Sequence, residues 1–295
     1  MFSYAGKVAW IELSEKKIFI ESRSSYKHLI GGRALGSYLV FKEVPETAHP
    51  LSRDNIITFN TGPLTGTLAP SAGRINISTK NVATNGISFA NAGGYFGPEL
   101  KFAGFDHLII QGKSEKPVYL FIHDNLIEII SADHLWGKDV WETEDLIRRE
   151  LKDRKIRVAS IGQAGENLVS MSCIMMDRSR AAGWGGCGAV MGSKKLKAIA
   201  VRGHGNLQLF DIEKFMNYNK IIWQRMLSTN AVRLFQEYGN FGTSGAGGIF
   251  GTLPQSVKNM EDEIWEDSKT LKVREIIFKE KYGQKKLADY TCPNV

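Results

Sequence analysis

The chain has 295 residues, 43% of them hydrophobic, and carries a formal net charge of +7 at pH 7. This length and apolar content are enough for one large folded domain or two ordinary ones. The sequence has no run of about 18 apolar residues, so we expect no membrane span and a cytoplasmic protein. Its basic residues are scattered among acidic ones, so we expect no nucleic-acid binding.

Three cysteines, Cys173, Cys187 and Cys292, lie far apart in the sequence. An odd number of cysteines at such spacing argues against a disulfide framework and is consistent with a reducing compartment. The six histidines show no spacing that is typical of a zinc site. We therefore expect them to be surface residues or core residues with ordinary hydrogen-bond partners.

Short apolar runs that alternate with polar residues, or that are rich in β-branched residues, predict strands through the first two hundred residues. In chain order they are 7–13, 17–21, 56–60, 74–78, 107–111, 118–123, 126–130, 157–161 and 198–202. The apolar spacing predicts a helix over 26–41, interrupted by Gly31-Gly32, and a second over 141–151. Strands and helices do not alternate strictly, so the expected class is α+β rather than a Rossmann fold.

An internal similarity indicates that this part of the chain is duplicated. The segments 97–103 and 192–198 resemble each other, and each leads into a predicted strand. Each is also preceded by a glycine-rich run, 91–94 in the first copy and 183–188 in the second. Two equivalent glycine-rich loops would suit a two-fold ligand, although chance similarity over so few positions is the alternative.

The character of the chain changes after about residue 211. The apolar period predicts helices over 212–227 and 231–238. A glycine-rich segment over 239–251 separates them from a charged helical tail over 271–287, which is dense in Lys and Glu. We therefore expect an α+β domain over 1–210, followed over 211–295 by an incomplete helical segment of the next domain.

The first of three glycine-rich stretches, 61–74, contains residues suited to binding a ligand. Its glycines let the backbone approach a ligand closely, and Arg74 offers a planar guanidinium for a phosphate or a polar heterocycle. The stretch lacks the Gly-Lys-Ser/Thr ending of a phosphate loop. An ordinary loop with a surface arginine is the alternative.

The other two stretches could bind anions through their backbone. The stretch 91–97 could form an anion-binding nest from consecutive amides, or a turn that leads to a core aromatic pair. In 177–192, Arg178 and Arg180 precede five glycines, an arrangement that suits a pyrophosphate, although the glycines could serve close packing alone. Cys187 has no cysteine or histidine at metal-ligand spacing, so we interpret it as structural.

In this order and spacing, the three stretches resemble the aldehyde ferredoxin oxidoreductase family. The matching segments are TGPLTG at 61–66, GR at 73–74, GGYFGPELKFAG at 93–104, IGQAGENLV at 161–169, RAAG at 180–183 and GAVMGSKKLKA at 188–198. Together with Gly31-Gly32-Arg33 they extend the resemblance over nearly all of residues 1–205. The resemblance implies a duplicated, mixed-sheet α+β domain that forms the base under a tungsten or molybdenum bis-pyranopterin.

The resemblance also assigns roles to individual residues. Arg74 would lie between the pterins and a neighbouring [4Fe-4S] cluster. The two pterin-phosphate loops would be formed by Asn91, Ala92 and Gly93 on one side and by Arg180, Ala181 and Gly183 on the other. The main-chain carbonyls of Asn91 and Ala181 would hold a magnesium ion between the phosphates, since a hard cation prefers oxygen ligands.

Two departures from the family pattern bear on these expectations. Trp184 stands where relatives often have another arginine, so we expect one phosphate contact to be missing. The family binds its cluster through three closely spaced cysteines and a distant fourth, whereas here only Cys292 is suitably placed. Asp289 or Val295 would occupy the position of its Cys-x-x-Cys partner. The chain therefore supplies at most one expected cluster ligand.

The resemblance therefore implies a truncated or split oxidoreductase that is inactive alone. A missing carboxyl-terminal region or a partner subunit would complete it, and a homo-oligomer is possible. The complete enzyme would oxidise aldehydes to carboxylic acids. Electrons would pass through the [4Fe-4S] cluster to ferredoxin or a similar carrier. The alternatives are a non-catalytic cofactor-carrier or interaction module, and a relative that acts on another substrate such as an aromatic thioester.

Overall fold

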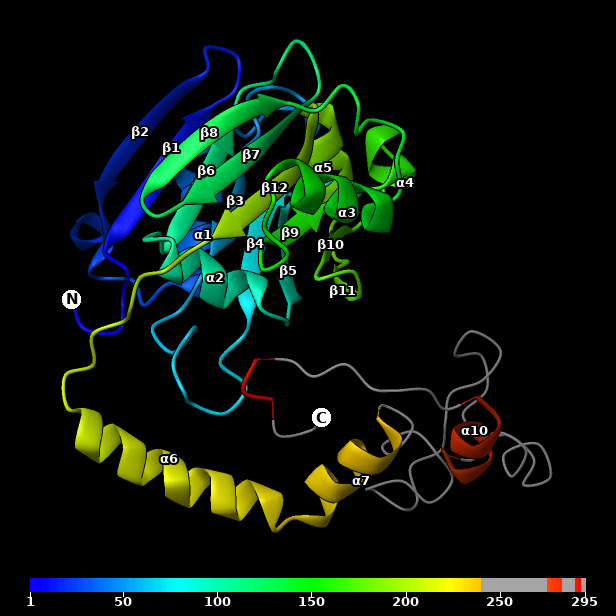
Figure 1. Ribbon diagram of the computed structural model, residues 1–295. Coiled ribbons are helices and arrows are strands. Elements are labelled where there is room, and N and C mark those ends of the chain that lie inside the picture. The colour runs from blue at the N-terminus through cyan, green and yellow to red at the C-terminus, as the bar shows by residue number, and fades with distance from the viewer. Residues whose placement is uncertain (240–274, 283–289, 293–295) are drawn as a thin grey trace. The chain divides into compact units, whose positions relative to one another are not determined.

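The computed structural model describes residues 1–239, 275–282 and 290–292 (Figure 1). The chain divides into two compact units: unit 1 comprises residues 1–67 and 72–210, and unit 2 comprises residues 68–71 and 211–295. Among the described residues, no helix combines the length and apolar character that crossing a bilayer requires.

Unit 1 contains two six-stranded mixed sheets. In the first sheet the strand order is β2-β1-β6-β3-β4-β5. The strands are β1 (Lys7–Glu12), β2 (Lys17–Ser22), β3 (Ile57–Asn60), β4 (Ile75–Lys80), β5 (Ile87–Ala92) and β6 (His107–Gln111). β1 and β6 run parallel, and the other neighbours run antiparallel.

The second sheet repeats this topology strand for strand, in the order β11-β10-β9-β12-β7-β8. Its strands are β7 (Val118–His123), β8 (Leu126–Ser131), β9 (Arg157–Ser160), β10 (Ile174–Met176), β11 (Arg180–Ala182) and β12 (Leu196–Arg202). β7 and β12 form the parallel pair that corresponds to β1 and β6, and the other neighbours are antiparallel. The expected duplication of a mixed-sheet unit is therefore confirmed.

The helices follow the same duplication. After the first hairpin of each half comes a longer helix, α1 (Gly32–Glu43) or α3 (Val140–Glu150), and before the last strand comes a short one, α2 (Phe96–Phe102) or α5 (Cys187–Ser193). The second half also has α4 (Gln163–Glu166), and a 3-10 turn (Arg23–Tyr26) precedes α1. The Gly31-Gly32 pair thus lies at the start of a helix rather than inside one.

The two halves have equivalent strands and helices, but the two similar sequence segments do not occupy equivalent positions in them. Gly97 lies in the first turn of α2, whereas Gly192 lies in the last turn of α5. The residues 196–198 already belong to β12, because the link from helix to strand is shorter in the second half. The similarity between 97–103 and 192–198 therefore pairs positions that are not structurally equivalent.

Unit 1 has four layers: α1, the first sheet, the second sheet and α3. Inward residues of both sheets, such as Ile11 and Val201, form one shared core. On the outer faces, Val8 packs with Leu35 of α1, and Ala200 packs with Ile147 of α3. This alternation follows from the two-residue period of a strand, and each large apolar side chain that is fully buried stabilises the fold by about 1.5–3 kcal/mol.

A local hydrogen-bond motif sets the start of α3. The Asp139 side chain accepts a hydrogen bond from the Glu142 amide at 2.8 Å, and the Glu142 carboxylate accepts one from the Asp139 amide at 3.3 Å. This capping box satisfies two amides that have no partner within the helix. The helix expected over 141–151 is therefore present, shifted by one residue.

Unit 2 contains α6 (Ile212–Leu227), α7 (Asn230–Tyr238) and α10 (Glu275–Tyr282). Asp211 caps α6 by accepting a hydrogen bond from the Lys214 amide at 2.9 Å, and Thr229 caps α7. Most of the glycine-rich segment 239–251 and the remainder of the predicted helix over 271–287 lie outside the described residues.

Candidate cofactor-binding site

The second and third glycine-rich stretches meet where the two sheets adjoin. β5 is an edge strand of the first sheet, β11 is an edge strand of the second, and the two strands contact each other. Asn91 and Ala181 are the penultimate residues of these strands, and Gly93 and Gly183 follow the strand ends. The duplication therefore places the two expected phosphate loops in equivalent positions. The interpretation of 91–97 as a turn is wrong for Asn91 and for the residue after it, which belong to β5.

The pairing of β4 with β5 brings the end of the first stretch close to the second stretch. Ile75 pairs with Ala92, and the Asn76 side chain donates a hydrogen bond to the Asn91 side chain at 3.2 Å. Arg74 immediately precedes β4, so its backbone lies opposite the residue that follows β5. The Arg74 side chain is exposed. The first stretch thus reaches the carboxyl end of β5, where Gly94 of the second stretch lies against Asp177 and Arg180 of the third.

Asp177 connects the second and third stretches. Its carboxylate accepts a hydrogen bond from the Tyr95 amide at 2.6 Å and lies 3.6 Å from the Arg157 guanidinium, which is positioned over the Tyr95 ring. Gly94 has φ +94°, and a Cβ there would lie 2.5 Å from the Asp177 carboxylate and 3.3 Å from Cγ of Arg180. Only glycine permits both this backbone conformation and this approach.

The glycines after β11 have two different roles. Gly185 has φ +75°, and a Cβ there would lie 2.3 Å from the Ser88 hydroxyl of β5. Gly186, also at positive φ, begins α5 against the Val82 side chain. In contrast, the atom nearest to a Cβ on Gly183 would be 4.0 Å away, and this residue is exposed. Close packing therefore explains Gly185 and Gly186, whereas Gly183 presents its backbone to solvent.

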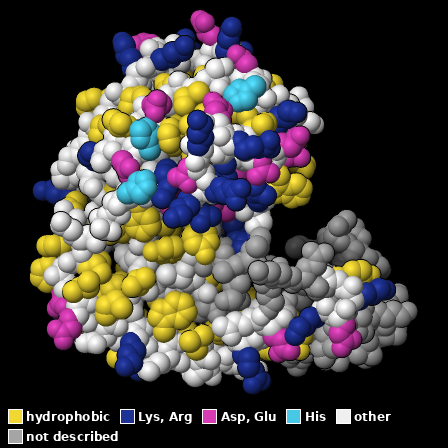
Figure 2. All heavy atoms as spheres, viewed as in Figure 1, with side chains coloured by type: hydrophobic (Ala, Val, Ile, Leu, Met, Phe, Trp, Pro, Cys, Tyr) yellow, Lys and Arg dark blue, Asp and Glu magenta, His cyan; other side chains and the backbone are white. Residues whose placement is uncertain are grey.

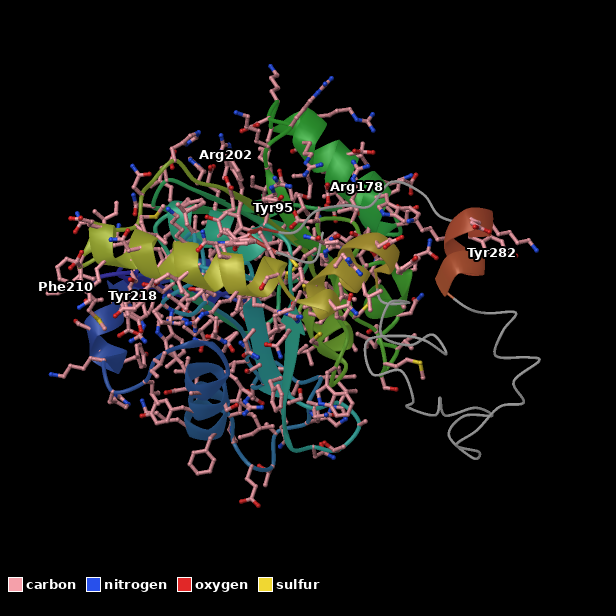
Figure 3. The ribbon with its side chains drawn as sticks, turned by 90° about the horizontal axis from the view of Figure 1, so that it is seen from below. Tyr95, Arg178, Arg202, Phe210, Tyr218 and Tyr282 are labelled. Carbon is pink, nitrogen blue, oxygen red and sulfur yellow. The ribbon has the colours of Figure 1, made fainter. Side chains whose placement is uncertain are left out.

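The side chains of the two arginines in the third stretch have different hydrogen-bond partners. Arg178 donates from Nε to the Glu144 carboxylate at 3.1 Å and from Nη2 to Asp145, so it is bound to α3 (Figure 3). Arg180 is half-buried, and its guanidinium donates to the Ser179 hydroxyl at 3.1 Å. Of the two, Arg180 lies on the strand that meets β5.

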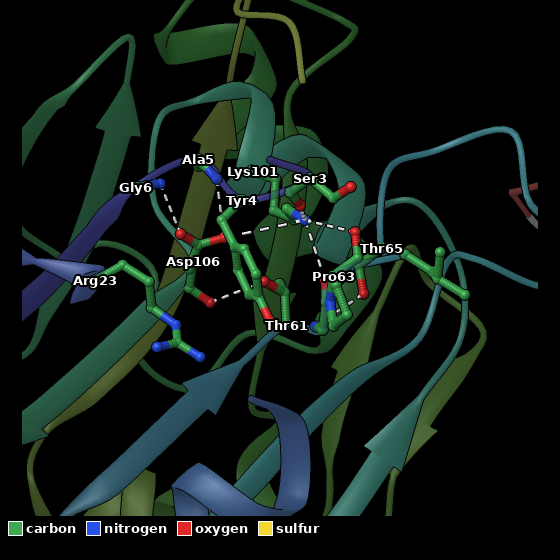
Figure 4. Close-up of polar contacts among 12 residues, drawn as sticks. Ser3, Tyr4, Ala5, Gly6, Arg23, Thr61, Pro63, Thr65, Lys101 and Asp106 are labelled. Atoms are coloured by element: carbon green, nitrogen blue, oxygen red, sulfur yellow. Dashed lines mark hydrogen bonds and ion pairs between the residues drawn. The ribbon is translucent and has the colours of Figure 1, made fainter. Parts of the chain in front are cut away.

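Lys101, which the sequence reasoning missed, attaches the first stretch to α2 (Figure 4). Its side chain is completely buried, and Nζ donates to the carbonyls of Gly62 at 3.0 Å, Pro63 at 3.3 Å and Ser3. Nζ also lies 4.0 Å from the buried Asp106 carboxylate. Burial lowers the pKa of Lys101 to about 8, against the attraction of Asp106. The available signal was Lys101 between two apolar residues, Leu100 and Phe102, of a short helix.

Hydrogen bonds continue from Lys101 to Arg74. The Gly62 amide donates to the Thr65 hydroxyl at 3.1 Å, and this hydroxyl donates to the Arg74 carbonyl at 3.0 Å. A Cβ on Gly97, in the first turn of α2, would lie 3.2 Å from the carbonyl of residue 73. The helix that follows the second stretch thus supports both ends of the first.

The remaining residues singled out in the sequence are two cysteines and a tryptophan. Burial raises the pKa of Cys187 to about 12, and its Sγ donates to the Ala182 carbonyl, which agrees with a structural role. Cys292 is half-buried in unit 2, and the described residues contain no group of three His, Cys, Asp or Glu side chains that could bind a metal. Asp289 and Val295 lie outside those residues. Trp184 is 67% exposed in the turn after β11.

The expectation for the histidines is wrong for His107. This residue is fully buried on β6, and neither ring nitrogen has a hydrogen-bond partner within residues 1–239 or the two shorter described segments. A Cβ on Gly31 would lie 3.3 Å from the His107 ring. Burial lowers the pKa of His107 well below its usual value, so the ring stays neutral.

Replacement of Asp177 by alanine is expected to lower the free energy of unfolding by about 1–3 kcal/mol, because the Tyr95 amide and Arg157 lose a charged partner. Urea denaturation followed by circular dichroism would measure this loss. Asp133→Ala is a suitable control, since the exposed Asp133 carboxylate accepts a hydrogen bond from the hydroxyl of nearby Ser131. An equal effect of the two substitutions would contradict the prediction.

Comparison with known proteins agrees with this architecture. The sequence profile of the "aldehyde ferredoxin oxidoreductase, N-terminal domain" matches residues 8–203. The tungsten-containing aldehyde ferredoxin oxidoreductase of Pyrococcus furiosus is 50% identical over 218 residues, which cover 73% of this chain and 36% of that protein. The protein of the same name from Thermococcus kodakarensis is 49% identical over the same shares.

Two further relatives extend over 99% of the chain. The aliphatic sulfonate oxidoreductase, WOR-like subunit, of Pyrococcus furiosus is 35% identical, and the match covers 49% of its length. The solved active-site complex BamBC of benzoyl coenzyme A reductase with 1,5-dienoyl-CoA aligns with a TM-score of 0.84 and 27% identity, over 46% of the matched chain. The chain thus spans between about a third and half of the length of these relatives. Its duplicated two-sheet fold and the profile match show that it belongs to the aldehyde ferredoxin oxidoreductase family and contains that family's amino-terminal domain.

Proposed function

We propose that this chain is the cofactor-binding part of an oxidoreductase that uses a tungsten, or molybdenum, bis-pyranopterin. The observation that carries the proposal is the convergence of the three glycine-rich stretches at the adjoining edges of two duplicated halves. A ligand with two like ends suits a site with two like halves. The tungsten named for the Pyrococcus and Thermococcus relatives supports the choice of metal.

The residues at the site fit such a group. Arg74 and Arg180 supply guanidinium donors for phosphates or pterin rings, and Gly183 offers a backbone that no side chain covers. β5 and β11 are edge strands, so the outer side of each leaves backbone groups without a partner in its sheet. In this proposal the carbonyls of Asn91 and Ala181 hold the bridging magnesium, and Ala92 and Gly93 complete the first phosphate loop.

When bound, the metal-pterin group would supply the oxidation and reduction chemistry, and this chain would bind and orient it. The reaction we propose for the complete enzyme is the oxidation of aldehydes to carboxylic acids, with electrons leaving through a [4Fe-4S] cluster to ferredoxin. Cys292 is the one cluster ligand that we assign to this chain. The other parts would come from further chain or from a partner subunit.

Exposed apolar side chains in unit 2 support the proposal that further chain or a partner subunit completes the enzyme. α6 exposes a series of large apolar side chains, namely Ile212, Met216, Tyr218, Ile221, Ile222 and Leu227. Exposed apolar surface of this extent is typical of an interface. The benzoyl coenzyme A reductase neighbour and the sulfonate oxidoreductase relative are themselves named as parts of assemblies.

A second candidate concerns the substrate rather than the cofactor. The structural neighbour was solved with a dienoyl thioester, and one relative is named for aliphatic sulfonates. An aromatic thioester is therefore the alternative to an aldehyde. The residues that we assign to the cofactor are the same for either substrate.

Cofactor retention tests the proposal. The 295-residue chain, purified from a tungsten-supplied host that makes bis-pyranopterin, is expected to retain tungsten and two pterins per metal. Arg74→Ala with Arg180→Ala should reduce retention at least about tenfold, since each lost charge-assisted hydrogen bond costs about 1.5–3 kcal/mol. Metal analysis and fluorescence of the oxidised pterin would measure both quantities.

The matched control for cofactor retention is Arg53→Ala with Arg225→Ala. It removes the same charge from exposed arginines outside the three stretches, and we expect it to retain cofactor as the wild type does. Wild-type protein free of pterin, or equal retention by both double variants, would contradict the proposal.

A further inference from the structure

A pocket lined mainly by basic residues lies apart from the cofactor-binding residues. Figure 2 shows Lys and Arg side chains gathered on the face of unit 1 in view. The pocket has a volume of about 500 Å³ and is lined by Asp145, Arg148, Arg149, Lys152, Arg154 and Arg178. These residues come from the second half of α3, from the connection between α3 and β9, and from the turn between β10 and β11.

Internal contacts hold part of the pocket lining in place. The carboxylate of Glu144, which is 2% exposed, accepts a hydrogen bond from Arg178 and forms an ion pair with Arg148 at 2.5 Å. Nε of Arg148 also donates to the Ile156 carbonyl at 2.9 Å, and the Trp141 ring donates to the Arg178 carbonyl at 3.1 Å. The guanidinium groups therefore hold their geometry before any ligand arrives, which reduces the entropy lost on binding.

The rest of the lining is not neutralised from within. Lys152 and Arg154 are exposed, and their side chains make no hydrogen bond or ion pair with any residue of the described chain. Asp145 in the lining and Glu144 behind it offset two of the five lining cations, so these seven residues together carry three more positive than negative charges. This excess matches a ligand with about three negative charges.

Helix stabilisation explains only part of this arrangement. Arg148 and Arg149 lie in the last turn of α3, where basic side chains offset the negative end of the helix dipole. Lys152, Arg154 and Arg178 lie outside the helix, so that effect does not account for them. The pocket volume is also in the range of small-molecule sites, whereas a protein partner would use a flatter surface.

We propose that this pocket binds a small polyanion bearing a diphosphate group. Arginine forks pair with phosphate oxygens in a bidentate manner, and Lys152 adds a mobile point charge at the rim. Both a nucleoside diphosphate and an inorganic polyphosphate contain such linked phosphate groups. None of the cofactor-binding residues assigned above takes part, so this inference does not rest on the proposed function.

Calorimetric titration of the 295-residue protein with pyrophosphate, at two salt concentrations, tests the inference. We expect saturable binding with one site per chain. Lys152→Ala with Arg154→Ala should raise the dissociation constant at least about tenfold, since two charge-assisted contacts are lost. Neither side chain bonds to another residue within the described ranges, so this variant is expected to fold normally, and circular dichroism would check it.

The control Lys27→Ala with Lys220→Ala removes the same charge from exposed lysines and should bind as the wild type does. No binding at 5 mM pyrophosphate, an equal loss in both double variants, or unchanged binding by Lys152→Ala with Arg154→Ala would overturn the inference. Loss of binding only in Arg74→Ala with Arg180→Ala would place the anion at the cofactor site and also overturn it.

Parallel titrations with ADP and with adenosine distinguish the two sources. ADP binding more than tenfold tighter than pyrophosphate indicates a nucleotide, and similar affinities indicate a free polyphosphate; both support the pocket. Adenosine binding as tightly as ADP would show that phosphates are not recognised, which contradicts the inference. Binding of an acidic protein through these cations without any binding of pyrophosphate would contradict it as well.

Discussion

Replacement of Lys101 by methionine is expected to lower the free energy of unfolding by about 3–5 kcal/mol. The substitution keeps most of the side-chain volume but removes the donor to the carbonyls of Ser3, Gly62 and Pro63. It also leaves the buried Asp106 carboxylate without its nearby ammonium group. Urea denaturation monitored by circular dichroism would measure the change.

The loss should be greatest in the first glycine-rich stretch. Because hydrogen bonds run from Lys101 through Gly62 and Thr65 to Arg74, hydrogen exchange at pH 7 should accelerate over 61–74 more than over β3 or β4. Such a result would identify Lys101 as a positioning residue for Arg74. Equal acceleration throughout unit 1 would assign it a general structural role instead.

Lys194 provides the matched control. It is also completely buried, and its Nζ donates to the carbonyls of Asn55 and Gly112, which lie outside the stretch 61–74. Lys194→Met should therefore lower the free energy of unfolding comparably without selective exchange over that stretch. Selective exchange in both variants, or a loss below about 1 kcal/mol in Lys101→Met, would contradict the prediction.

Raising the pH from 7 to 10.5 should stabilise the wild type relative to Lys101→Met. Burial lowers the pKa of Lys101 from 10.5 to about 8 in the folded protein. Between these values the unfolded chain binds the proton and the folded chain does not, so the free energy of unfolding rises with pH. The shift corresponds to at most about 3 kcal/mol, because each pKa unit is worth about 1.4 kcal/mol.

The measurement is the difference in free energy of unfolding between wild type and variant at pH values from 6.5 to 10.5. It should be constant below about pH 7, where Lys101 is charged in both states, and increase above that. Lys194, whose pKa burial lowers to about 7, should give the same sign at somewhat lower pH in Lys194→Met. A difference that falls with pH would show that Lys101 is charged more readily in the fold than in solution.

Strong local patterns made much of the fold predictable. The alternation in β1 and in β7 was sufficient to identify these strands, because each buries one set of residues against the shared core and the other against a helix. The apolar spacing of residues 141–151 predicted α3, whose start the capping box of Asp139 and Glu142 sets in the structure. The glycine-rich stretches identified the family, and with it the residues proposed to bind the cofactor.

Other elements were not recognisable because their conformation depends on distant partners. β10 and β11 have only three residues each, too few for a period, and they are strands because they pair with each other and with β9. α5 was hidden in a glycine-rich run. Its amino-terminal Gly186 needs the space that the Val82 side chain and a carbonyl sixteen residues upstream leave open.

The sequence by itself determined the fold class and the family, and the family resemblance implied the duplication. These depend on side-chain period and ordered motifs, which are local properties of the chain. Only the tertiary structure decided that Gly185 serves packing while Gly183 is open, that Arg178 binds α3, and that Lys101 supports Arg74. The role of a glycine or a buried charge depends on the atoms that surround it, and here many of those atoms come from residues far away in the sequence.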